Sequence, residues 1–158
     1  MVEEGAEPPV ELVEEFVRVA HRIVWCTLAT VDRRRRPRAR VVHPYWERRD
    51  GSLIGWVLTR PTPLKRAHLA GSPFASCSYW DPAHEVAVAE CEAAFAGDEL
   101  TRRRVWDLFA NAPAPLGYDP KMLGAADPLD EAITVLELVP WRLHVAVPGG
   151  TAATWRRG

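Results

Sequence analysis

The sequence predicts a small α+β barrel in which five or six strands, joined by antiparallel-type hairpins, are accompanied by peripheral helices. Two observations predict this class. The β-rich runs are separated by hairpin-type turns such as Asp50-Gly51, and amphipathic helical runs stand at residues 10–24 and 99–110. A doubly wound parallel sheet fits this pattern less well.

Length and composition fit one soluble domain. The chain has 158 residues, of which 47% are hydrophobic and 26% charged. Its net charge of −1 creates no global field that would attract nucleic acid or an anionic membrane. No apolar run approaches the roughly 20 residues of a membrane span, and the acidic start is unlike a secretory signal. We expect a cytoplasmic protein with no nucleic-acid and no membrane partner.

The cysteines and histidines predict no metal site. Cys26, Cys77 and Cys91 lie in apolar or alternating runs without any C-x-x-C spacing. Buried, reduced thiols therefore fit better than a disulfide or a metal centre. The five histidines are dispersed and show no metal-ligand spacing.

The N-terminal half predicts a helix and three strands. The helix is expected over residues 10–24, after a loose leader at residues 1–9. Two strands follow, at 25–31 and 37–46, joined by a polar hairpin. Its tip carries four consecutive arginines, which we interpret as a solvated loop rather than a nucleic-acid contact. The turn at Asp50-Gly51 then leads into a third strand, Ser52 to Thr59.

The C-terminal half predicts three more strands and a second helix. Strands are expected at residues 74–80 and 85–95, followed by a helix over 99–110 that Asp98 caps. Residues 111–128 are rich in proline and glycine and predict a long surface excursion. A last strand at 133–147 should be bent or at an edge near Pro140, because proline cannot donate to a ladder. The domain would thus span 10–148, with a polar tail at 149–158.

The turn after the third strand predicts an anion cradle. Prolines and hydroxyl residues crowd residues 59–63, and a helix start with adjacent cations follows. Such a turn presents unpaired backbone N–H groups. Lys65 stands out because the chain has only one other lysine, Lys121, and a compact ammonium suits a phosphate. A solvated helix cap is the alternative interpretation.

The order of these motifs resembles the pyridoxamine 5'-phosphate oxidase-like split β-barrel family, whose members bind FMN or a deazaflavin coenzyme. The matching residues are Ala29-Thr30-Val31-Asp32, Pro37, Arg40-Val41-Val42, Trp56, Thr59, Lys65, Leu69 and Ser72-Pro73. The resemblance implies a six-stranded antiparallel split β-barrel with peripheral helices. It also implies a homodimer with two cofactor sites at the subunit interface.

The resemblance further implies which residues bind the cofactor. The strand of Arg40 to Val42 would line the flavin ring, Thr59 and Lys65 would contact the phosphate, and Glu85 would lie near the ring. The full expected set is Arg40, Val41, Val42, His43, Leu58, Thr59, Arg60, Thr62, Lys65, Arg66 and Glu85.

Two departures from the family pattern bear on function. Pro63 and Leu64 stand where relatives often carry a serine and an arginine that touch phosphate, although Arg60, Thr62 and Arg66 are nearby. The chain also lacks the C-terminal extension that helps the true oxidase hold its substrate. Pyridoxamine phosphate oxidase activity itself is therefore not expected.

The sequence thus favours an FMN-binding oxidoreductase that transfers hydride through a flavin to or from a small-molecule substrate. The alternatives are a reductase that uses the deazaflavin coenzyme F-420, and a non-enzymatic flavin- or haem-binding dimer. No residue is a convincing dedicated acid or base, so no catalytic residue is assigned. Patterns of zinc proteases, serine hydrolases, Rossmann and P-loop proteins are absent.

Overall fold

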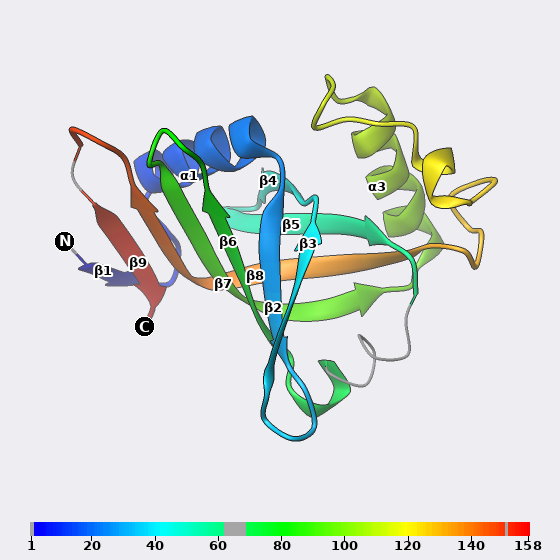
Figure 1. The fold of residues 1–158 in the computed structure, drawn as a ribbon, viewed down its shortest axis with the longest axis horizontal. Helices are drawn as coiled ribbons and strands as arrows, with labels where there is room; N and C mark the ends of the chain where they lie inside the picture. Colours follow the sequence, from blue (N-terminus) through cyan, green and yellow to red (C-terminus); the bar gives the residue numbers. More distant parts are fainter. Residues whose placement is uncertain (1, 62–68, 151) are drawn as a thin grey trace.

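The computed structural model describes residues 2–61, 69–150 and 152–158, which form one α+β fold (Figure 1). The helices in this part of the chain are α1 (Val10–Ile23), α3 (Glu99–Asn111) and the short 3-10 helix η1 (Pro120–Leu123). The strands are β1 (Val2–Gly5), β2 (Cys26–Val31), β3 (Pro37–Val42), β4 (Tyr45–Arg49), β5 (Ser52–Thr59), β6 (Phe74–Trp80), β7 (Val86–Ala96), β8 (Thr134–Ala146) and β9 (Ala153–Arg157).

The strands of the described residues form one nine-stranded sheet that curls on itself. Its main path runs β1-β9-β8-β7-β6-β2-β3, and β5 branches from β8 and carries β4. Every pairing is antiparallel except that of β1 with β9. The predicted α+β barrel class is confirmed, with more strands than the six expected.

The extra strands have three sources. Residues 37–46 were expected to form one strand, but they form β3 and β4, divided around His43-Pro44. The expected loose leader contains β1, and the expected polar tail contains β9. These two short strands pair in parallel, with Val2 opposite Thr154. Backbone hydrogen bonds to a distant part of the chain therefore order segments whose own composition predicts a loop.

The interior is built on aromatic contacts beneath α1. Phe16 of α1 packs edge-on against Trp46 of β4, with ring centroids 5.0 Å apart. The indole of Trp46 donates a 2.8 Å hydrogen bond to the hydroxyl of Tyr79, so both polar groups are satisfied inside the core. The three cysteines of β2, β6 and β7 lie in the same core cluster as buried free thiols, as predicted.

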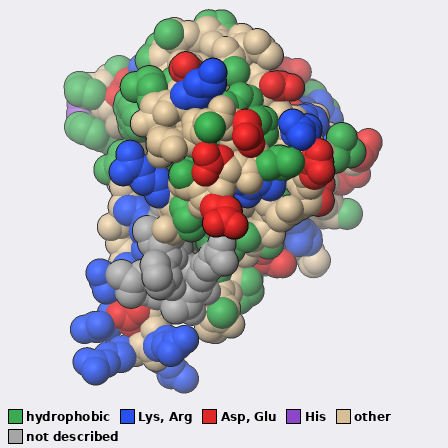
Figure 2. Space-filling model, turned by 90° about the vertical axis from the view of Figure 1, so that its right-hand side faces the viewer, with side chains coloured by type: hydrophobic (Ala, Val, Ile, Leu, Met, Phe, Trp, Pro, Cys, Tyr) green, Lys and Arg blue, Asp and Glu red, His purple; other side chains and the backbone are tan. Residues whose placement is uncertain are grey.

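Two turns follow from local backbone chemistry. Asp50 and Gly51 join β4 to β5 with φ angles of 50° and 81°, the left-handed pair of a type I′ hairpin turn. In the other hairpin, the Asp32 carboxylate accepts hydrogen bonds from the backbone N–H groups of Arg34 and Arg36, at 2.8 and 2.9 Å. The arginine tip is exposed, as predicted, and Figure 2 shows cationic side chains gathered at this lower end of the molecule.

The two longer helices have the expected limits. Asp98 caps α3 by accepting a 2.9 Å hydrogen bond from the backbone N–H of Thr101. α1 ends at Val24, which adopts a φ of 73°. Within the described residues, no helix is long and apolar enough to cross a membrane.

We expect Gly55→Ala to lower the free energy of unfolding by about 1–3 kcal/mol. A Cβ at Gly55 would lie 2.7 Å from the ring of Trp46, which faces it across the β4–β5 pair. Neither Trp46 nor the strand has room to shift, because Trp46 is only 1% exposed. Chemical denaturation measures the loss.

The matched control is Gly97→Ala, where an added Cβ meets no atom within 4 Å. This variant should match the wild type. Equal stabilities for the two alanine variants would contradict the close approach of Gly55 to Trp46.

Candidate functional site

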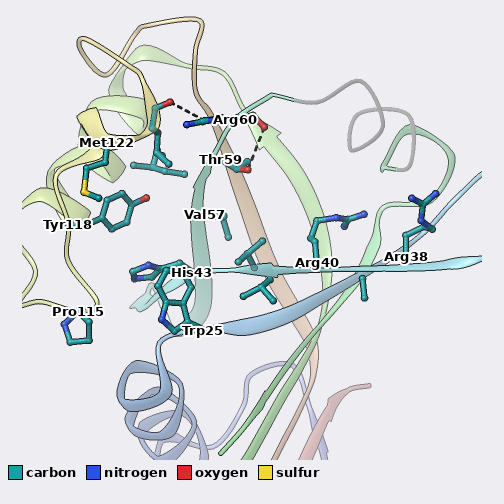
Figure 3. A pocket seen from close by; sticks show the side chains of 15 residues that line it. Trp25, Arg38, Arg40, His43, Val57, Thr59, Arg60, Pro115, Tyr118 and Met122 are labelled. Carbon is teal, nitrogen blue, oxygen red and sulfur yellow. Dashed lines mark hydrogen bonds between the residues drawn. The ribbon is translucent and has the colours of Figure 1, made fainter.

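A cleft lies where β3 faces the end of β5, beneath the segment that connects α3 to β8. Its volume is about 760 Å³, within the roughly 300–1,000 Å³ typical of ligand sites. Figure 3 shows the 15 residues that line it: Trp25, Arg38, Ala39, Arg40, Val41, Val42, His43, Val57, Leu58, Thr59, Arg60, Pro115, Tyr118, Met122 and Leu123.

Most of the residues expected to bind a cofactor meet in this cleft. Seven of them line it: Arg40, Val41, Val42, His43, Leu58, Thr59 and Arg60. They come from β3, β5 and the residue after each, and these two strands are not paired with each other, so the fold brings them together. Thr62, Lys65 and Arg66 lie outside the described residues, and their role as the anion cradle stays a prediction.

Glu85 lies elsewhere. Its carboxylate accepts hydrogen bonds from Arg22 at 2.6 Å and from Arg18 at 3.2 Å, both on α1. These hydrogen bonds lower its pKa. Glu85 does not line the cleft of this chain; it joins the β6–β7 turn to α1, and its role near a cofactor stays a prediction.

One end of the cleft is cationic. Arg40 donates hydrogen bonds of 3.0 and 2.9 Å to the hydroxyl of Thr30, a neutral partner. Burial and the nearby charge of Arg38 lower the pKa of Arg40, although a guanidinium stays protonated in proteins. Among the described residues, no carboxylate forms an ion pair with Arg38, Arg40 or Arg60. An anionic group bound here would relieve this unbalanced positive charge.

The other end is apolar and aromatic. The ring of His43 meets Trp25 edge-on, with centroids 4.7 Å apart, and lies 5.1 Å from the ring of Tyr118. Val57 of β5 lies across the cleft from this group (Figure 3). Flat rings of this kind form walls suited to a planar ligand.

His43 is a neutral member of the aromatic end. Burial lowers its pKa, which outweighs the opposing effect of a hydrogen bond with the Leu116 backbone. Its Nε2 atom is buried without a hydrogen-bond partner. No group of three or more His, Cys, Asp or Glu side chains in the described part of the chain could hold a metal ion.

Sequence reasoning missed the wall supplied by the long connection. Pro115, Tyr118, Met122 and Leu123 close the cleft from the segment between α3 and β8. They could not be predicted from the sequence, because they are far along the chain from β3 and β5 and a loop has no periodicity that marks its residues. Arg38 was also missed, although it alternates with Arg40 on β3 and the two-residue period of a strand would have found it.

Two arginine side chains bind backbone carbonyl oxygens of this connection, one in the part that follows the wall and one in the wall itself. The guanidinium of Arg102 on α3 donates to the carbonyl oxygens of Pro128, Asp130 and Ile133, at 3.1, 3.0 and 3.2 Å. Arg60 donates at 3.3 Å to the carbonyl oxygen of Leu123, which joins the wall to the end of β5. The cleft therefore has a defined shape on all three sides.

No protein-family model matches the sequence, and no curated protein does. Solved structures do match the fold. One is a Clostridium acetobutylicum protein related to general stress protein 26 of B. subtilis, of the pyridoxinephosphate oxidase family. The TM-score is 0.67 at 10% identity, over 94% of this chain and 96% of that one. The fold is that of the pyridoxamine 5'-phosphate oxidase-like split β-barrels.

Two further split barrels show the range of this likeness. A pyridoxamine 5'-phosphate oxidase-related, FMN-binding protein of Nostoc punctiforme has a TM-score of 0.62 at 15% identity, over 89% of this chain and 84% of that one. A haem-binding protein of Mycobacterium smegmatis has a TM-score of 0.61 at 21% identity, over 95% of this chain and 59% of that one. At these identities the likeness establishes the split-barrel fold alone.

We expect stability to fall between neutral pH and about pH 4 because of His21, which lies behind His43. Burial, with a smaller effect of the charge on His43, lowers the pKa of His21 to about 4. The unfolded chain, with a histidine pKa near about 6.5, binds the proton more tightly across this window. The free energy of unfolding should therefore rise with pH from about 4 to 6.5, by roughly 2–3 kcal/mol, and then level off.

Denaturation of His21→Gln at a series of pH values checks this expectation. The variant should show a flatter pH profile than the wild type, even though it loses the 3.0 Å hydrogen bond from the Trp46 backbone N–H. His84→Gln, at an exposed turn, controls for the loss of one imidazole. A His21→Gln profile as steep as that of the wild type would contradict the assignment.

Proposed function

We propose that the chain is a flavin-binding oxidoreductase that holds FMN in the cleft between β3 and β5. The observation that carries the proposal is the division of this cleft into an aromatic end and an end with Arg38 and Arg40, which form no ion pair with a carboxylate in the described part of the chain. FMN has the same division, because it joins a planar ring system to a phosphate. The residues present therefore fit the group.

In this assignment the strand residues position the cofactor. Arg40 and Arg38 supply positive charge to an anionic part of the ligand, and charge-assisted hydrogen bonds of this kind are strong. Trp25, His43 and Val57 enclose the ring and exclude water from it. A bound flavin supplies the hydride chemistry. The neutral, buried His43 is not placed as a general acid or base.

The charge at the arginine end also fits a deazaflavin coenzyme of the F-420 type, which has a planar ring and an anionic tail as well. The departures at Pro63 and Leu64 favour that alternative over FMN, because they remove two expected phosphate donors. Haem binding is the second candidate, favoured by Tyr118 and Met122. Phenolate and thioether groups are both known iron ligands, and these two side chains line the same cleft.

Absorption spectroscopy after dialysis tests the proposal. The purified protein is mixed separately with FMN, with the deazaflavin coenzyme and with haem, and then dialysed. A retained two-banded flavin spectrum is the expected result. Retention of the deazaflavin alone, or of a haem Soret band alone, would replace FMN with that ligand. Retention of none would overturn the assignment of the cleft as a cofactor site.

We expect Arg40→Gln to weaken FMN binding by about 10- to 100-fold, because it removes a charged donor from the cleft. Fluorescence titration measures the dissociation constant. The matched control is Arg33→Gln, in the same hairpin but outside the cleft, which should bind FMN like the wild type. Equal affinities of the two variants would remove Arg40 from the site.

We also propose that the chain forms a homodimer through the outer face of β2, β3 and β6. The β2 register places Val31, Val41 and Phe74 on one face, and these side chains are 36%, 70% and 52% exposed. Trp80 at the end of β6 is 61% exposed on the same face. Large exposed apolar patches of this kind mark interaction sites. The face borders the cleft, because Val41 belongs to both.

We expect Phe74→Lys to shift the chain from dimer to monomer in sedimentation analysis, because it places a charge on this apolar face. Leu100→Lys is the control, since Leu100 is 79% exposed on α3, away from the face. A wild-type chain that sediments as a monomer, or a Phe74→Lys variant that stays dimeric, would refute this interface.

A further inference from the structure

We propose that Tyr118 determines ligand specificity in the cleft, by donating a hydrogen bond from its hydroxyl to an acceptor atom on the ligand's ring system. The acceptor would be a carbonyl oxygen or a ring nitrogen. The inference deepens the proposed function and rests on it, because it requires that the cleft binds a planar ring.

Tyr118 stands on a different wall from the strand residues. It belongs to the connection between α3 and β8, whereas Arg40 and His43 belong to β3 and the residues just after it. Figure 3 shows its ring beside His43 and its hydroxyl pointing into the cleft, away from the surrounding backbone. A ring held between His43, Trp25 and Val57 would present its edge to this hydroxyl.

The wall holds Tyr118 in one place. The backbone N–H of Tyr118 donates at 3.0 Å to the carbonyl oxygen of Phe109, and the preceding Gly117 donates at 2.8 Å to that of Pro113. Gly117 packs so closely that a Cβ there would lie 1.8 Å from the carbonyl oxygen of Ala112. The phenol ring also packs against Phe109, with centroids 5.2 Å apart. A donor fixed by its surroundings discriminates between ligands better than a mobile one.

The hydroxyl is available to a ligand. No hydrogen-bond partner for it is found among the described residues, although most of the phenol ring is buried. Burial raises the pKa of Tyr118 to about 12, so the phenol is protonated and remains a donor at neutral pH. A ligand that offers an acceptor satisfies this group, whereas one that does not leaves it unpaired in an apolar environment.

The cationic end cannot provide this selectivity. Arg38 and Arg40 would attract any anionic ligand of suitable size, whatever the chemistry of its ring. His43 does not compete for the role, because its Nε2 atom is buried and inaccessible to solvent. The Tyr118 hydroxyl, by contrast, can distinguish ring systems by the acceptors that they offer.

The test compares Tyr118→Phe with the wild type, using three probes and fluorescence titration. FMN and riboflavin carry ring acceptors, with and without a phosphate, and anthracene-2-sulfonate carries an anion on a ring without acceptors. The variant should bind FMN and riboflavin about three- to tenfold more weakly, the effect of one lost hydrogen bond. Its affinity for anthracene-2-sulfonate should not change.

The matched control is Tyr45→Phe. Tyr45 also packs against Phe109, with centroids 6.1 Å apart, but does not line the cleft. It should bind all three probes like the wild type. Thermal unfolding checks both variants, and each should keep the wild-type midpoint because the ring contacts remain.

The outcomes separate this inference from the proposed function. Unchanged riboflavin affinity in Tyr118→Phe would overturn the inference and leave the flavin site standing. An equal loss for all three probes would also overturn it, because that result indicates a displaced ring rather than a lost hydrogen bond. Failure of the wild type to bind either flavin would overturn the proposed function, and this inference with it, before any substitution is compared.

Discussion

The long strand β8 changes one of its hydrogen-bonded neighbours along its length, and the arrangement of the molecule depends on that change. Residues Thr134 to Leu138 pair with β5, and residues Arg142 to Val145 pair with β9. Pro140 and Trp141 lie where the neighbour of β8 changes from β5 to β9. The missing N–H of proline is tolerated between these two pairings, and the register of β8 against β7 shifts at the same point. β5 and β9 diverge at this point. The C-terminal end of β5, at Thr59, therefore lies opposite β3, and the cleft forms between β5 and β3.

Most of the fold could be predicted from the sequence, because it depends on interactions between residues that are close along the chain. The Asp50-Gly51 turn, the Asp98 cap and the alternation of β6 each depend on residues a few positions apart, and each was predicted within a residue or two. The strand residues of the site were predicted for a different reason. Arg40 and Thr59 were placed by resemblance to a family with the same fold, and the fold brings them into one cleft.

What the sequence did not reveal depends on contacts between distant segments. β1 is short and mostly exposed, and β9 is short with polar ends, so only their pairing with each other and that of β9 with β8 makes them strands. The hydrogen bonds of Glu85 to the arginines of α1 join residues more than sixty positions apart, and no local pattern predicts them. The wall that carries Tyr118 depends on backbone hydrogen bonds to the end of α3 and the residues after it, such as that from the Tyr118 N–H to the Phe109 carbonyl oxygen, which no sequence pattern specifies.

The three cysteines give the folded chain a property unrelated to its site. Cys26, Cys77 and Cys91 lie on neighbouring strands of the barrel, and each is at most 2% exposed. Thiolates react with alkylating reagents, and burial blocks access to these thiols, while hydrogen bonding to a neighbouring cysteine together with burial raises the pKa of Cys26 and Cys77. Alkylation of these thiols therefore requires that the sheet opens. The rate of alkylation, followed by mass spectrometry without any attached label, would report how often the barrel opens and which strands separate first.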